Sequence, residues 1–159
     1  MPDLYCVDTS FLINGWRKHY RIDVFAPVWD RLDVLIEDGT LLSCEEVYFE
    51  LARQKDELLE WAKYRKAAFQ KPTARTIAEC KKIMSKYPNF AASGGSTNAA
   101  DPWVIAHAIA TESTVVTDET RAPNQRATKP PRIPDVCDAM GIRWLPPIDF
   151  LAEVGIDFK

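Results

Sequence analysis

Four short apolar segments, separated by longer segments with helical periodicity, are the feature that most constrains the fold of this chain. They lie at Leu4–Val7, Thr40–Cys44, Thr114–Thr117 and Ile142–Leu145. Each is too short for a buried helix and has the composition of a strand buried on both faces. Strands that alternate with helices form a parallel sheet, because each crossover helix returns the chain to the same edge. The pattern therefore predicts a three-layer α/β/α sandwich around a mostly parallel sheet of about four or five strands.

The segments between these strands carry apolar residues at helical spacing. Such residues recur every three or four positions and share one face of a helix. We expect helices directly after Ser10 and over residues 25–38, 45–69, 73–84, 99–110, 134–140 and 148–154, with 45–69 forming one helix or two in series. Residues 88–98 and 120–133 are rich in turn-forming and polar residues, so we expect loops there.

Length and composition bound the class of protein. With 159 residues, of which 47% are hydrophobic, the chain is predicted to form a single domain over residues 1–159. No apolar segment is long enough to span a membrane and no secretory signal is evident, so we expect a cytoplasmic protein. The four cysteines lack CxxC spacing, which favours buried free thiols over a zinc site. The net charge of −3 does not by itself indicate nucleic-acid binding.

Acidic residues stand where a parallel α/β fold places its ligand site. Asp8 follows the first predicted strand, Asp118 follows the third, and Asp101 lies in the first turn of a helix. Glu46 and Glu50 are about one turn apart on one face of the helix that begins at residue 45. Ligands bind beyond the carboxyl ends of parallel strands, where these acids would gather. Clustered carboxylates repel one another unless a hard cation neutralises them, and oxygen ligands select Mg²⁺ or Mn²⁺.

Each acid, taken singly, also fits a structural role. Asp8, with its Thr and Ser neighbours, fits a helix N-cap, and Asp101 fits a favourable interaction with a helix dipole. Glu46 and Glu50 fit a solvated helix face, and Asp118 fits a turn. The joint arrangement of strand-end and helix-start acids favours a shared metal site over these separate roles.

Four ordered motifs resemble those of the PIN-domain family. They are YCVDTSFLI, VYFEL, ADPWVIAHA and TVVTDE. Three further segments, DVFAPVWDRL, DELLEWA and IPDVCDAMGI, resemble DUF4411, a PIN-like family of bacteria and archaea. The resemblance extends over nearly the whole chain and implies a PIN-like fold, although a fold alone does not establish an activity.

The resemblance also implies roles for individual residues. The metal-binding and catalytic acids would be Asp8, Glu50, Asp101 and Asp118. Glu119 is an additional candidate ligand, and Glu46 is the alternative to Glu50 as the helix acid. Supporting hydroxyl groups would come from Thr9, Ser10 and Thr117. The ion that these residues would bind is Mg²⁺ or Mn²⁺.

The residue types favour metal-assisted hydrolysis over histidine chemistry. The chain has only two histidines, His19 and His107, and their sequence contexts give no reason to expect them to meet. A cation held by carboxylates activates water for in-line attack on phosphorus without any histidine. The resemblance therefore implies a metal-dependent endoribonuclease that hydrolyses RNA phosphodiester bonds.

Basic residues follow two of the acidic motifs and are predicted to contact RNA phosphates. They are Arg17, Lys18, Arg21, Arg121, Arg126, Lys129 and Arg132. Many PIN-domain proteins are toxins of toxin–antitoxin pairs and many form dimers, so the resemblance also implies a cognate antitoxin and a homodimer.

Two other readings differ in class from a nuclease. A PIN-like module could bind RNA or protein without catalysis, and Mn²⁺ titration would separate it from the enzyme. A phosphotransferase with an Asp nucleophile is less favoured, because Ser10 stands where a haloacid-dehalogenase-type site has a second Asp.

Overall fold

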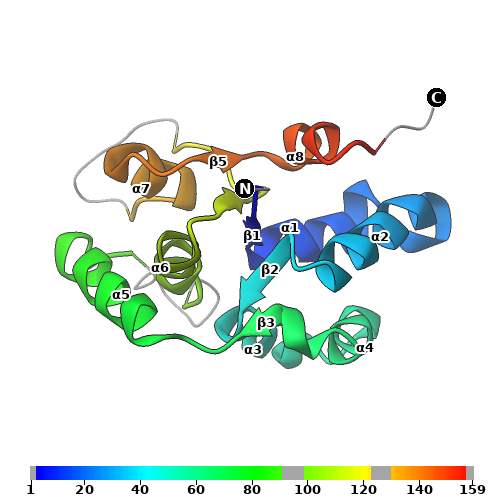
Figure 1. Cartoon of the computed structure of the whole chain (residues 1–159), viewed down its shortest axis with the longest axis horizontal. Helices are drawn as coiled ribbons and strands as arrows, with labels where there is room; N and C mark the ends of the chain where they lie inside the picture. Colours follow the sequence, from blue (N-terminus) through cyan, green and yellow to red (C-terminus); the bar gives the residue numbers. More distant parts are fainter. Residues whose placement is uncertain (1–2, 91–98, 123–129, 157–159) are drawn as a thin grey trace.

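A five-stranded, all-parallel sheet runs through the centre of the protein in the order β3-β2-β1-β4-β5 (Figure 1). The computed structural model describes residues 3–90, 99–122 and 130–156. The strands are β1 (Tyr5–Val7), β2 (Leu41–Cys44), β3 (Phe69–Gln70), β4 (Thr114–Val116) and β5 (Trp144–Leu145). The predicted parallel sheet is confirmed, with β1 at its centre.

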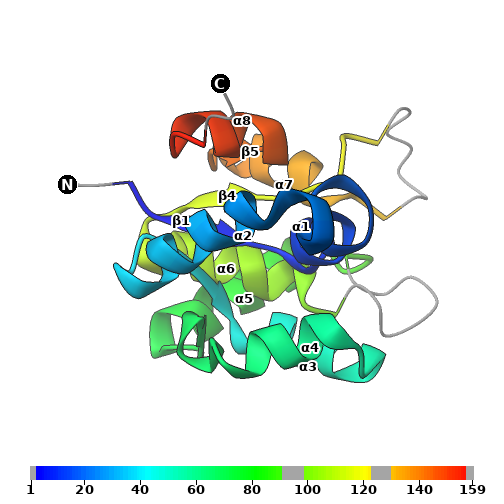
Figure 2. The same cartoon turned by 90° about the vertical axis from the view of Figure 1, so that its right-hand side faces the viewer.

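Helices cover both faces of this sheet and complete the three predicted layers. They are α1 (Thr9–Asn14), the π-helical turn η1 (Gly15–His19), α2 (Ile22–Glu37), α3 (Glu45–Gln54), α4 (Glu57–Lys63), the 3-10 turn η2 (Lys66–Ala68), α5 (Ala74–Lys86), α6 (Asp101–Thr111), α7 (Ile133–Met140) and α8 (Pro147–Glu153). In Figure 1, α5, α6 and α7 lie on the left of the sheet, and α2, α4 and α8 lie on the right. Figure 2 shows α8 at one end of the molecule and α3 with α4 at the other.

The segment 45–69 is two helices in series, but its last residue belongs to a strand that the helical prediction missed. Lys55 ends α3 in a left-handed conformation with φ of 49°, and the Asp56 side chain then caps α4. Phe69 pairs with Ser43 of β2 and packs its ring edge-on against Tyr48. The helical expectation for Phe69 was therefore wrong, because the open edge of β2 and burial of the ring outweigh local periodicity.

The other predicted elements are confirmed within a few residues. Thr73 caps α5 by accepting a hydrogen bond from the Thr76 amide, and Pro102 stands in the first turn of α6, where its missing N–H is tolerated. Gly141 ends α7 with φ of 68°, a left-handed conformation that favours glycine. Of the two predicted loops, residues 91–98 and 123–129 lie outside the described part of the chain.

The core places the start of α6 at the carboxyl edge of the sheet. Val104, Ile105 and Ala106 are each fully buried, so α6 is embedded between the sheet and α5 rather than lying on the surface. All four cysteines are free and buried, as expected for thiols used in packing. No helix in the described ranges is long and apolar enough to cross a membrane.

Candidate metal centre

Asp8 lies at the end of β1, the central strand, and caps α1. Its Oδ1 accepts a hydrogen bond from the Phe11 amide at 2.8 Å, and its Oδ2 accepts one from the Thr117 hydroxyl at 2.6 Å. The Ser10 hydroxyl lies 2.9 and 2.8 Å from the two carboxylate oxygens. Burial raises the pKa of Asp8 to about 7, although the hydrogen bond from Thr117 opposes this shift. Asp8 is therefore a buried carboxyl group held in one orientation by its neighbours.

Glu50 extends from α3 toward the same edge. Its Oε1 accepts a hydrogen bond from the Thr9 hydroxyl at 2.5 Å, and burial raises its pKa. Its Oε2 is buried and accepts no hydrogen bond from the residues that the structure describes. Glu46, about one turn earlier, has its pKa raised by burial and by Glu45. Of these two glutamates, the structure joins Glu50 to the carboxyl end of β1 through Thr9.

Asp101 is the first residue of α6 and lies near the acids described above. Only 8% of its surface is exposed. Burial raises its pKa to about 9, and the negative charges of Glu119, Asp8 and Glu50 contribute further. Burial likewise raises the pKa of Glu119. We give the name acid cluster to Asp8, Glu50, Asp101 and Glu119. Asp8 directly follows β1, Glu50 and Asp101 lie in α3 and α6, and Glu119 lies in the chain that leaves β4.

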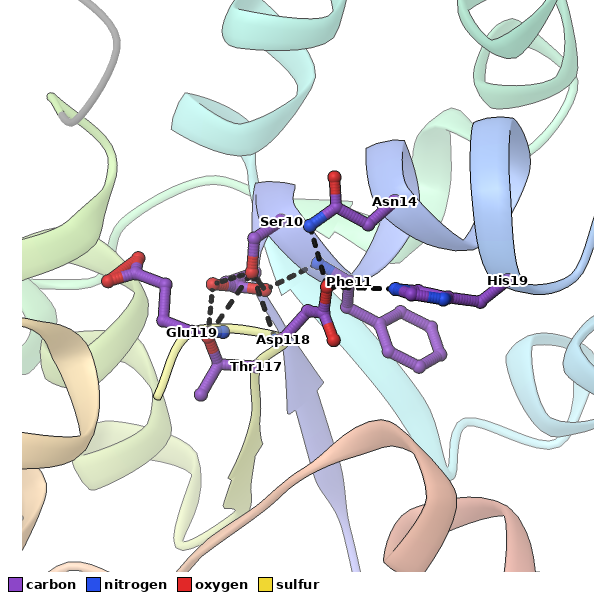
Figure 3. A network of polar contacts seen from close by, with 8 residues as sticks. Ser10, Phe11, Asn14, His19, Thr117, Asp118 and Glu119 are labelled. Carbon is purple, nitrogen blue, oxygen red and sulfur yellow. Dashed lines mark hydrogen bonds and ion pairs between the residues drawn. The ribbon is translucent and has the colours of Figure 1, made fainter. Parts of the chain in front are cut away.

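Asp118 and Glu119 are adjacent in sequence, yet their side chains diverge (Figure 3). The Glu119 amide donates to the Thr117 hydroxyl at 3.0 Å, and the Asp118 amide donates to the Ser10 hydroxyl at 3.0 Å. The Asp118 carboxylate points away from Glu119 and accepts hydrogen bonds from Asn14 and His19. Asp118 stands at a bend between Thr117 and Glu119, and hydrogen bonds from the Asp118 and Glu119 amides set the direction in which the chain leaves β4. The two acidic side chains therefore have different surroundings.

The acid cluster fits a hard divalent cation in its chemistry. The atoms that it offers to an ion are carboxylate oxygens, and the Glu50 Oε2 is a buried acceptor without a donor among the described residues. As the side chains stand, no three His, Cys, Asp or Glu residues within the described ranges form a group that could hold a metal ion. Mutual repulsion opposes a closer approach of unneutralised carboxylates. Binding an ion would therefore require the side chains to move closer together.

The family model described as a domain of unknown function (DUF4411) matches residues 5–158. The chain belongs to the DUF4411 family. The fold of this DUF4411 chain is similar to one found in the crystal structure of VapBC2 from Rickettsia felis bound to a DNA fragment from their promoter. That match has a TM-score of 0.51 and 14% identity, and covers 90% of this chain and 98% of the other. The PIN-like fold expected from the motifs is thereby confirmed. No curated protein matches the sequence.

Several basic residues that were predicted to bind RNA have carboxylate partners in this DUF4411 structure. Arg17 lies 3.0 Å from Asp56, and Arg21 contacts Asp23. Arg121 also pairs with a carboxylate, that of Asp138, and lies over the Trp144 ring. Arg132 contacts the Thr120 hydroxyl. Lys18 is exposed on η1, and Arg126 and Lys129 lie outside the described residues.

The two histidines of the DUF4411 chain lie in different environments, as expected. His107 is buried in α6, where its Nε2 is 2.8 Å from Gln70 Oε1 and its Nδ1 is 3.4 Å from the Thr76 hydroxyl. His19 is about half exposed and contacts Asp118. The sequence did not single out Asn14 or the contact of His19 with Asp118, because both depend on residues about a hundred positions apart.

Proposed function

We propose that this DUF4411 protein is an endoribonuclease whose Mg²⁺ or Mn²⁺ is held by the acid cluster. The observation that carries the proposal is that three carboxylates, Asp8, Glu50 and Asp101, are buried at the carboxyl edge of the sheet, with Glu119 near enough for its charge to raise the pKa of Asp101. Burying several carboxylates together costs free energy, and a bound cation would offset that cost. In this proposal Glu119 takes the place that the motif resemblance assigned to Asp118.

The surrounding hydroxyl groups would orient the acids for this role. Thr9 holds one oxygen of Glu50 and leaves Oε2 free to bind. Ser10 and Thr117 hold Asp8, and Thr117 also fixes the backbone at Glu119. A bound divalent ion would supply activation of water and stabilisation of the charge that develops on the phosphate. The protein's part is to fix the ligands and exclude water from around them.

RNA is the proposed substrate, and a protein partner is part of the proposal. The basic residues after the first and last acidic motifs would contact phosphates, and Arg17 and Lys18 are both exposed on η1. The resemblance to PIN-domain toxins supports a cognate antitoxin and a homodimer. The chain would then be the toxin of such a pair.

A non-catalytic binding module is the second candidate, because the acid cluster does not form a closed ligand set as it stands. Isothermal titration with Mn²⁺ separates the two functions at the first step. The wild type should bind Mn²⁺, Asp101→Asn should bind it at least tenfold more weakly, and Glu60→Gln, on the exposed side of α4, should behave as wild type.

Cleavage then tests the activity itself. A panel of RNAs that includes structured tRNA should be cut with Mn²⁺ or Mg²⁺, remain intact with EDTA, and remain intact with Asp101→Asn. If Mn²⁺ binds tightly and no RNA of the panel is cut, the binding module is the better description of this protein.

A further inference from the structure

Asp118 joins two side chains that follow the first acidic motif. Its Oδ2 accepts a hydrogen bond from Asn14 Nδ2 at 2.6 Å and lies 3.3 Å from His19 Nε2. The side chain of Asp118 is 22% exposed and that of His19 is 47% exposed, so the trio lies at the surface of the site (Figure 3). The side chains of Asn14 and His19 hydrogen-bond to Asp118 and not to Asp8.

The turn that carries His19 is closed by its own backbone hydrogen bond and anchored at Tyr20, directly after its last residue. The Tyr20 amide donates to the Gly15 carbonyl at 2.8 Å, and the Trp29 indole donates to the Tyr20 carbonyl at 2.5 Å. Arg17, within the turn, bonds to Gln54 at the end of α3. A π-helical turn is rare and is often found at functional sites. Here it gives His19 a defined position.

The position of the trio is tied to the acid cluster through the backbone. The Asp118 amide donates to the Ser10 hydroxyl, which contacts both carboxylate oxygens of Asp8. The next residue, Glu119, belongs to the acid cluster. A substrate phosphate at the cluster would therefore have its adjoining sugars within the neighbourhood of the trio.

The hydrogen-bonding capacity of the trio defines what it can recognise. A carboxylate only accepts hydrogen bonds, so Asn14 contributes an N–H and His19 contributes its Nε2–H. In the neutral ring this leaves His19 Nδ1 as an acceptor, and Asn14 keeps its Oδ1 as an acceptor. These atoms match a hydrogen-bond donor rather than a phosphate oxygen. Next to a phosphodiester, the donor that RNA has and DNA lacks is the ribose 2′-hydroxyl group.

We propose that Asp118 is a positioning residue, which orients His19 so that its Nδ1 accepts a hydrogen bond from a ribose 2′-hydroxyl group beside the acid cluster. The proposal rests on the proposed function, since it concerns how the same site selects RNA. It assigns different roles to two neighbouring residues: Glu119 would bind the metal ion, and Asp118 would orient the side chain that binds the sugar.

Mn²⁺ titration tests whether Glu119, and not Asp118, binds the metal ion. Glu119→Gln should weaken Mn²⁺ binding at least tenfold, whereas Asp118→Ala and His19→Phe should keep the affinity of the wild type. Equal losses of Mn²⁺ affinity in Asp118→Ala and Glu119→Gln would overturn the assignment, because Asp118 would then be a metal ligand.

Binding of an RNA oligonucleotide and a DNA of the same sequence, followed by fluorescence anisotropy, tests recognition of the sugar. His19→Phe should weaken RNA binding about tenfold, the size of one hydrogen bond, and leave DNA binding unchanged. His19→Gln should restore most of the RNA affinity, because its amide can donate to Asp118 and still present an acceptor. Equal effects of His19→Phe on RNA and DNA would overturn the proposal.

The double variant tests whether Asp118 acts through His19. Asp118→Ala with His19→Phe should bind RNA no more weakly than the more affected single variant, because the two changes remove one shared interaction. Additive losses would overturn the positioning role. Failure of the wild type to bind RNA at all would instead count against the proposed function, so the two failures are distinguishable.

Discussion

Replacement of Asp101 by Asn should stabilise the metal-free protein and reduce the stabilisation that bound metal provides. Asp101 is buried at the first residue of α6, where burial and the charges of Glu119, Asp8 and Glu50 raise its pKa from 3.8 to about 9. The folded, metal-free protein must therefore either keep this carboxyl protonated or desolvate a repelled charge. Asn has almost the same shape as Asp and carries no charge, so it removes this cost.

The direction of the effect follows from the number of bound protons. Between about pH 4 and pH 9 the metal-free folded protein holds more protons than the unfolded chain, so its free energy of unfolding falls as pH rises. A pKa of about 9 instead of 3.8 corresponds to at most about 6 kcal/mol at pH 8. Because the neighbouring Glu119 also has a raised pKa, the two carboxyl groups share the cost of burial, and removing the charge of Asp101 recovers only part of it. We therefore expect Asp101→Asn to gain about 1–3 kcal/mol at pH 8 and less at pH 5.

Metal should stabilise the wild type more than the variant. At an Mn²⁺ concentration a hundred times the wild-type dissociation constant, wild type gains about 2.7 kcal/mol, and a variant that binds Mn²⁺ at least tenfold more weakly gains at most about 1.4 kcal/mol. Urea denaturation at pH 5 and pH 8, in EDTA and in Mn²⁺, measures all four conditions. Glu60→Gln is the matched control, since Glu60 is exposed on α4 and undergoes the same change of charge.

Two results would refute this reasoning. In EDTA at pH 8, an Asp101→Asn protein less stable than wild type would show that Asp101 makes favourable contacts that outweigh its repulsion. Equal stabilisation of wild type and Asp101→Asn by Mn²⁺ would remove this residue from the ligand set.

Three further predictions follow from the same structure. Thr117→Val keeps the side-chain volume but removes the hydroxyl that holds Asp8, so Mn²⁺ affinity should fall about tenfold in isothermal titration, with near-normal circular dichroism. Combined Arg121→Gln and Arg132→Gln should lower RNA affinity and flatten its dependence on salt; an unchanged salt slope would place RNA elsewhere. Light scattering at micromolar concentration should give the mass of a homodimer, and a monomer mass would contradict that expectation.

Much of the fold was predictable because its signals are local. The strands β1, β2 and β4 are short apolar segments, and caps such as Thr73 and Gly141 mark helix ends within a few residues. β3 was missed because two residues carry no periodicity of their own. Phe69 is a strand residue only because β2 offers an open edge beside it.

The candidate site was likewise predictable only in part. Asp8 and Asp101 were predictable, since each stands next to a strand end or helix start that the sequence marks. The separate surroundings of Asp118 and Glu119 were not, because they depend on how the chain leaves β4. That direction is set by hydrogen bonds to Ser10 and Thr117.

By itself, the sequence determined the alternation of strands and helices and placed acids at the edge where parallel strands end. Those properties depend on residues a few positions apart, which interact within one element. Only the tertiary structure decided which acids lie near one another: it brings Asp101 near enough to Asp8 and Glu50 for their charges to raise its pKa, and it turns Asp118 toward Asn14 and His19. The physical reason is that charge repulsion and hydrogen bonding act over a few ångströms of space, whatever the separation along the chain.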